Sequence, residues 1–186
     1  MIPVESLSRF FVVYNTKDNF DYELFLVKSS NESEIENDPI TSIPTTILVS
    51  LLQLTSVYIK ISKKIPKGFS DFCLKSLFDR DPLIYVAIIK LLTDCFNIMY
   101  KILPTISTKI LDLCLNPLPK YFVEQIAVIH LIESIDFNDT FPMEKFRYKP
   151  IEIIYDFLKS PPHPSVLTEI KKMTEKQYKI LLGVLT

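Results

Sequence analysis

The hydrophobic positions in the first third of the chain fall in short runs of strand length, whereas those of the rest recur at helical spacing. The runs FFVVY at residues 10–14 and YELFLV at residues 22–27 are aromatic and β-branched, and turn-forming residues separate them, which predicts a hairpin. The run VYIKI at residues 57–61 places its apolar side chains on one face and predicts a third strand. Because a lone hairpin is only marginally stable, a helix beginning near Pro44 is expected to cover this sheet.

The helical pattern begins at Phe69, within a stretch at residues 65–82 that we call the joint. From here on, apolar residues recur every three or four positions. A first helix is expected to end at Asp81-Pro82, where the carboxylate can cap the next helix and the proline suits its first position. That next helix, at residues 82–103, is apolar on much of its circumference and is therefore predicted to be the central, most buried one.

Proline-rich breaks divide the rest of the chain into shorter helices. These are expected at residues 107–115, at residues 121–135, from Pro150, and at residues 165–182. The predicted fold is therefore mostly α, of the α+β class, with a small N-terminal β-rich domain at residues 1–66 and a helical bundle domain at residues 67–186.

Composition and charge limit the classes of partner. The chain of 186 residues is 48% hydrophobic and 23% charged, which is the mix of a folded globular protein. Its net charge of −1 gives no long-range attraction to nucleic acid or to an anionic membrane, so any DNA contact is expected to be local. The candidates for a phosphate contact are Lys60, Lys63, Lys64 and Lys67, which otherwise solvate the predicted strand and turn and protect a sheet edge.

The sequence offers little that is typical of catalysis. With only two glycines, no glycine-rich phosphate loop can form, and no cofactor is predicted. The three cysteines are widely spaced among apolar residues, which indicates core residues in a reducing intracellular compartment rather than disulfides or a metal motif. His130 is expected to be partly buried in a helix and His163 to lie in an exposed linker. We therefore predict a protein that is not an enzyme, with no catalytic residue, no metal and no small-molecule substrate.

Three further stretches carry weaker signals. The uncharged run at residues 40–59 approaches bilayer length, but its proline and its many Ser, Thr and Gln residues favour a buried helix followed by a strand, and no membrane association is predicted. The acidic residues 29–38 lack the ligand pattern of a calcium loop, which favours a solvated loop. The N-terminus has no basic region before a long apolar core, so no signal peptide is expected.

Short motifs follow one another in a defined order between residues 7 and 103. They are Ile43-Pro44, Ile65-Pro66, Phe69, Leu77-Phe78, Asp81-Pro82, Lys90-Leu91 and Phe96. With the predicted strands and helices around them, they resemble the small subunits of the GINS complex of eukaryotic DNA replication, and are most similar to the third of these subunits.

This resemblance implies a β-rich small domain followed by a helical domain, in a nuclear, non-catalytic subunit of a heterotetramer of related chains. Such a subunit would act as a scaffold that braces the replicative DNA helicase, with its sister subunits and the helicase components as partners. Helices peripheral to the predicted core are the expected contact surface. The candidate partner-interface residues are Ile151, Ile154, Leu158, Leu167, Ile170 and Leu181.

Two alternatives are kept. The first is a compact helical protein-protein interaction module, such as a viral or parasite binder of a host factor, with no role in replication and with a groove beside residues 82–103 for a partner helix. It predicts that residues 10–14 and 22–27 do not pair in a sheet. The second is a small enzyme with a cysteine-based site, which predicts a thiol of lowered pKa near His130.

Overall fold

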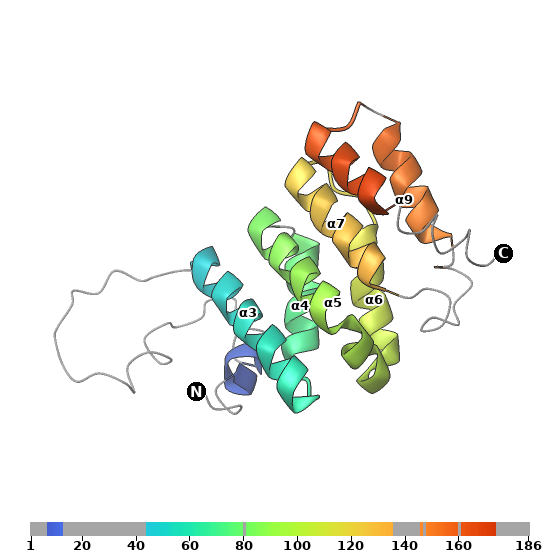
Figure 1. Ribbon diagram of the computed structural model, residues 1–186. Coiled ribbons are helices and arrows are strands. Elements are labelled where there is room, and N and C mark those ends of the chain that lie inside the picture. The colour runs from blue at the N-terminus through green and yellow to red at the C-terminus, as the bar shows by residue number, and fades with distance from the viewer. Residues whose placement is uncertain are drawn as a thin grey trace, which may run out of the picture.

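The computed structural model describes residues 7–12, 44–79, 81–135, 146, 148–159 and 161–173, and these residues are mostly helical, without a strand (Figure 1). The named helices are α3 (Thr45–Ser62), α4 (Phe69–Asp79), α5 (Pro82–Ile102), α6 (Pro104–Leu115), α7 (Phe122–Ser134) and α9 (Lys149–Leu158). Residues 7–12 and 164–173 are also helical. The prediction of a mostly helical protein is confirmed.

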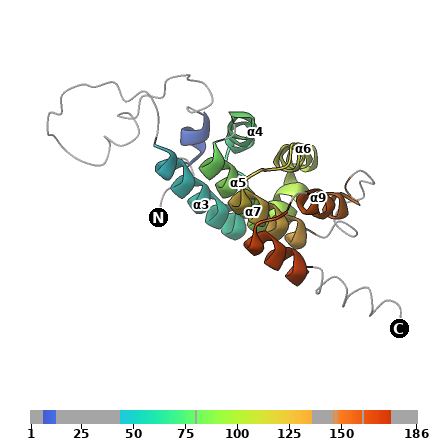
Figure 2. The ribbon, with the colours of Figure 1, turned by 90° about the horizontal axis from the view of Figure 1, so that it is seen from above.

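The helices α3, α5 and α7 lie side by side in a row, and α4 and α6 lie together on one side of it (Figure 2). The helix α5 packs against α3, α4, α6 and α7, which confirms the prediction that residues 82–103 form the central helix. The helical residues 164–173 run beside α7 (Figure 1). As a result, the opposite side of the row, which we call the front face, is not covered by α4 or α6.

The predicted strands are wrong wherever the structure describes them. Residues 10–12 of FFVVY are helical, and VYIKI at residues 57–61 lies within α3. The reason is burial at helical spacing, which outweighs the β propensity of a short run. The buried residues of α3 are Leu48, Leu51, Leu52, Thr55, Ser56 and Ile59. YELFLV lies outside the described residues, and within them there is no β-rich N-terminal domain.

The joint holds the short N-terminal helix, residues 7–12, against α4. Gly68 has a positive φ of 78°, and a Cβ placed there would meet main-chain atoms of Phe11 and Val12 at 3.0 Å. The Phe11 ring also contacts the ring of Phe69, with centroids 5.2 Å apart, and the ring of Phe72, at 5.1 Å. Glycine is therefore needed here for both its backbone conformation and its lack of a side chain.

At its other end the joint starts the central helix as the sequence predicts. The Asp81 carboxylate accepts hydrogen bonds from the main-chain N–H groups of Leu83, at 2.9 Å, and Ile84, at 3.1 Å. Pro82 occupies the first turn. The cap and the proline therefore satisfy the exposed amide end of α5, as predicted.

Candidate functional site

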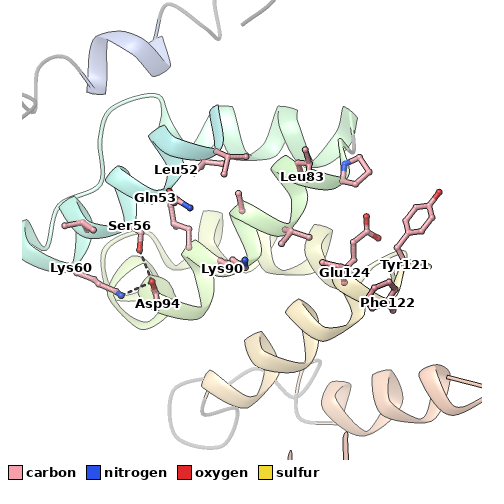
Figure 3. A pocket seen from close by; sticks show the side chains of 17 residues that line it. Leu52, Gln53, Ser56, Lys60, Leu83, Lys90, Asp94, Tyr121, Phe122 and Glu124 are labelled. Carbon is pink, nitrogen blue, oxygen red and sulfur yellow. Dashed lines mark hydrogen bonds and ion pairs between the residues drawn. The ribbon is translucent and has the colours of Figure 1, made fainter. Parts of the chain in front are cut away.

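A hollow of about 710 Å³ opens on the front face between α3, α5 and the start of α7 (Figure 3). We call it the front groove. Lys60 of α3 and Asp94 of α5 lie at one end, and Tyr121 and Phe122 lie at the other (Figure 3). The groove therefore runs along most of α5, with α3 as one wall.

The walls of the front groove carry large apolar side chains that folding leaves in water. Val57 of α3 is 53% exposed, Leu83 of α5 is 61% exposed, and Tyr121 before α7 is 67% exposed. Phe122 and Val123 are also exposed at the same end. Single exposed apolar residues are ordinary on a protein surface, but a group gathered around one hollow is typical of an interaction site.

A second hollow of about 510 Å³ lies between α5 and α7, beside the front groove. Four residues line both hollows: Val86, Lys90, Asp94 and Val123. Val86, Lys90 and Asp94 are spaced by four positions and therefore share one face of α5. They form a ridge between the two hollows, with one apolar and two charged side chains along it and a depression on each side.

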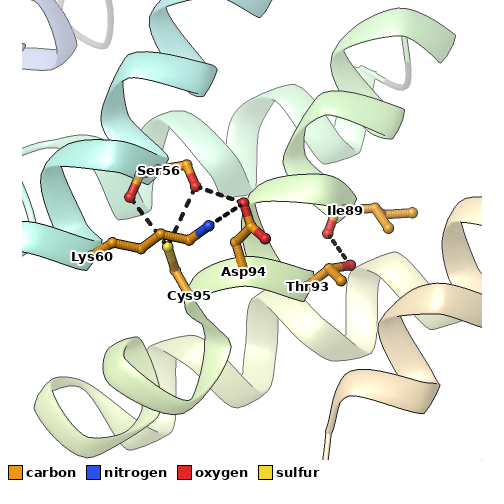
Figure 4. A network of polar contacts seen from close by, with 6 residues as sticks. All are labelled: Ser56, Lys60, Ile89, Thr93, Asp94 and Cys95. Carbon is orange, nitrogen blue, oxygen red and sulfur yellow. Dashed lines mark hydrogen bonds and ion pairs between the residues drawn. The ribbon is translucent and has the colours of Figure 1, made fainter.

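A polar network fastens α3 to α5 at one end of the groove (Figure 4). The Asp94 carboxylate accepts a hydrogen bond from Ser56 Oγ at 3.1 Å and lies 2.8 Å from the Lys60 Nζ. The Cys95 Sγ donates to the Ser56 main-chain carbonyl at 3.4 Å. The Asp94 carboxylate therefore already has two donors from α3. The network is best explained as a structural contact that holds α3 against α5.

The cysteines have the opposite of the environment that a nucleophile needs. Cys73, Cys95 and Cys114 are free and buried. Burial raises the pKa of Cys73 well above its ordinary value, and the nearby Cys114 adds to this. Burial also raises the pKa of Cys95, against the opposing hydrogen bond from Ser56. These two thiols are protonated at neutral pH, whereas the enzyme hypothesis requires a thiolate.

Both histidines take part in contacts between α7 and the C-terminal part of the chain. His130 of α7 is exposed rather than partly buried, and its Nε2 lies 3.3 Å from Glu169 Oε2. The His163 ring stacks on the Phe122 ring with centroids 4.3 Å apart. The pKa of Glu169 is lowered, most by its hydrogen bond with Lys172 and next by that with His130. Among the described residues no group of three or more His, Cys, Asp or Glu residues could hold a metal ion.

The predicted interface residues separate in the structure. Ile151 and Leu158 are exposed on α9, where they share a face with the exposed Tyr148 and Tyr155. By contrast, Ile170 is only 5% exposed. Ile154 and Leu167 are partly buried, and Leu181 lies outside the described residues. Partner contact through these residues stays a prediction, and those that are exposed for it, Ile151 and Leu158, lie on α9.

The predicted phosphate-contacting lysines also divide. Lys60 forms the ion pair with Asp94 and lines the front groove. Lys63, Lys64 and Lys67 are exposed between α3 and α4, and Lys63 has a left-handed backbone with a φ of 56°. Because Asp94 offsets the charge of Lys60, the local positive charge is carried by the other three. A phosphate contact there stays a prediction.

The alternative of a helical interaction module placed a groove beside residues 82–103, but the contribution of α3 to the front groove was missed from the sequence. Treating residues 57–61 as a strand hid the helical phase that places Gln53, Val57 and Lys60 on one side of α3. The four- and three-residue spacing of these positions was the available signal.

No family model, curated protein or solved structure matches the chain. By length and composition, the helices α3 and α5 are apolar enough to cross a membrane, but α5 is the buried central helix of the bundle, for which such a composition is ordinary.

Proposed function

We propose that the protein is a non-catalytic binding module that holds an apolar helix of a partner protein in the front groove. The observation that carries this proposal is the group of exposed apolar side chains around one hollow, contributed by α3, α5 and the start of α7. Their burial by a partner would be favourable, since roughly 25 cal/mol is gained for each Å² of apolar surface removed from water.

The shape of the groove favours a helix as its occupant. Pro82 and Asp94 mark its two ends on α5, and twelve steps with a rise of about 1.5 Å each give a length of about 18 Å. This length matches about three turns of a partner helix. A helix laid against two parallel neighbours is a recurrent mode of peptide recognition, in which apolar residues at three- and four-residue spacing enter the groove.

The experiment is purification of the tagged protein from its own cells, followed by mass spectrometry of what accompanies it at matched stoichiometry. The test variant carries Val57→Asp and Leu83→Asp, two exposed positions of the groove. The control is Phe78→Asp, because Phe78 is 85% exposed on α4, away from the groove. Circular dichroism and thermal melts check that all variants are folded.

We expect a stoichiometric partner with the wild-type protein and with the control, and its loss from the groove variant. A partner that is retained by the folded groove variant would show that binding occurs elsewhere. A wild-type protein that purifies alone would contradict the proposed function.

A narrower candidate is a GINS-like scaffold that braces the replicative helicase. The observation that favours it is the joint, where Asp81 caps α5 and Pro82 occupies its first turn, in the positions that the resemblance requires. Against it, no strand precedes the joint among the described residues, where the resemblance implies a β-rich domain. The same purification tests it: three small sister chains and helicase subunits would support it, and one unrelated partner would contradict it.

A further inference from the structure

We propose that the helix bound in the front groove carries one acidic side chain that pairs with Lys90. This inference rests on the proposed function and specifies the chemistry of the partner. Lys90 lies on the ridge of α5 and lines both hollows of the front face. A helix that fills the groove therefore passes over or directly beside its ammonium group.

The charge of Lys90 is not offset within the described part of the chain. Lys90 is exposed, and its ammonium group forms no hydrogen bond or ion pair with any described residue. Asp94 lies one turn away on the same face, but its carboxylate is held by Lys60 and Ser56 of α3. Glu124, which also lines the groove, forms no ion pair with Lys90 either.

Because apolar side chains flank Lys90, its charge determines which side chain of a partner is favoured opposite it. Val86 precedes it by one turn on the ridge, and Val123 lines the same two hollows. An apolar partner surface would remove water from the ammonium group and supply no acceptor, which is strongly unfavourable. A carboxylate supplies a charge-assisted hydrogen bond, whereas a basic side chain adds repulsion.

The same reasoning limits the partner to one acidic position in this region. Lys60 at the end of the groove already has Asp94 as its counter-charge at 2.8 Å. The expected partner helix therefore has apolar residues that enter the hollows on the two sides of the ridge, and one Glu or Asp between them at the level of Lys90. Specificity would come mainly from this position, because an apolar groove alone discriminates weakly among apolar helices.

The experiment uses a displayed library of 18-residue helical peptides and the full-length protein. Every peptide has leucine at three- and four-residue spacing. One position near the middle of the peptide, beside the leucine face, is Glu, Gln or Lys. Binding is compared for the wild type, for Lys90→Glu and Lys90→Met, and for the groove variant with Val57→Asp and Leu83→Asp. The control is Lys109→Glu, because Lys109 is exposed on α6, on the other side of the row.

We expect the wild type and the Lys109→Glu control to enrich Glu peptides at least tenfold over Lys peptides. Lys90→Glu should reverse this preference and Lys90→Met should remove it. If the peptides bind and the groove variant loses them, but their enrichment does not depend on the central residue or on Lys90, the inference is wrong and the proposed function stands. If no peptide binds the wild type better than the groove variant, both are overturned.

Discussion

Replacing Asp81 by alanine tests whether the joint fixes the start of the central helix. The Asp81 carboxylate accepts hydrogen bonds from two first-turn N–H groups of the 21-residue α5, at 2.9 and 3.1 Å. Loss of such a cap costs about 1 kcal/mol of stability. Loss of the negative charge at the helix N-terminus adds about 0.3–1 kcal/mol. The contact with Thr45 Oγ1, at 3.5 Å, lies at the limit of a hydrogen bond and contributes little.

We therefore expect Asp81→Ala to lower the free energy of unfolding by about 1.3–2 kcal/mol. The assay is equilibrium urea unfolding followed by circular dichroism. With an m-value of about 2.5 kcal/mol per molar urea, the midpoint should fall by about 0.5–0.8 M. Asp81→Ser and Asp81→Asn are the matched controls, because both keep an acceptor for the N–H groups and remove only the charge.

The controls should lose about a quarter to a half of the stability that Asp81→Ala loses, and the m-value should not change. Two results would refute the reasoning. An alanine variant within about 0.3 kcal/mol of the wild type would mean that the cap adds nothing beyond hydration of the same groups. A serine variant as unstable as the alanine variant would show that the hydrogen bonds are not the cause.

Three further predictions concern the joint and the core. In the same unfolding assay, Gly68→Ala should destabilise by about 1–3 kcal/mol, because φ is positive there and the added Cβ would lie 3.0 Å from the main chain of the N-terminal helix. Lys63→Gly, at another positive φ, should stabilise by about 0.5 kcal/mol. Tyr85→Phe should cost about 1–2 kcal/mol, because the hydroxyl donates at 2.6 Å to a buried carbonyl in the last turn of α6. Thiol reagents should label Cys73 and Cys95 only after unfolding, and stability should fall above about pH 8.5, where unfolded thiols lose protons and the buried thiols, with raised pKa, do not.

The parts of the fold that the sequence predicts correctly depend on local signals. A proline in a first turn and a capping carboxylate specify a helix start wherever they occur, so Asp81-Pro82 defines the beginning of α5 without any knowledge of its neighbours. The break at Asn116-Pro117 likewise ends α6 and separates it from α7. These signals act within a few residues, so they can be recognised without knowing how the helices pack.

The incorrect strands come from segments whose structure is decided by burial. Phe10 and Phe11 belong to an aromatic run, but both are buried, and contact between Phe11 and the rings of Phe69 and Phe72 holds them on α4. In α3, Ile59 is buried while Val57 and Ile61 are exposed, so the three apolar residues that the strand prediction placed on one face of VYIKI point in different directions in the helix. A run of five residues cannot distinguish the two structures, because its neighbours set the helical phase.

The lining of the front groove could not be predicted for a different reason, although one alternative expected a groove beside residues 82–103. Its lining comes from about three turns each of α3 and α5 and from the start of α7. The sequence of a helix shows how much of its circumference is apolar but not which neighbour covers it. The helix α5 is apolar on much of its circumference and was expected to be the most buried helix, yet Leu83 is 61% exposed because α4 and α6 pack on one side of the row only. Lys90 and Asp94 are the charged residues of α5 along this face, and Asp94 is paired with Lys60 whereas Lys90 has no ion pair with a described residue. A charged residue on an apolar helix that is covered on one side indicates the uncovered side, and the partner that we propose to complete the bundle has to match the charge of Lys90.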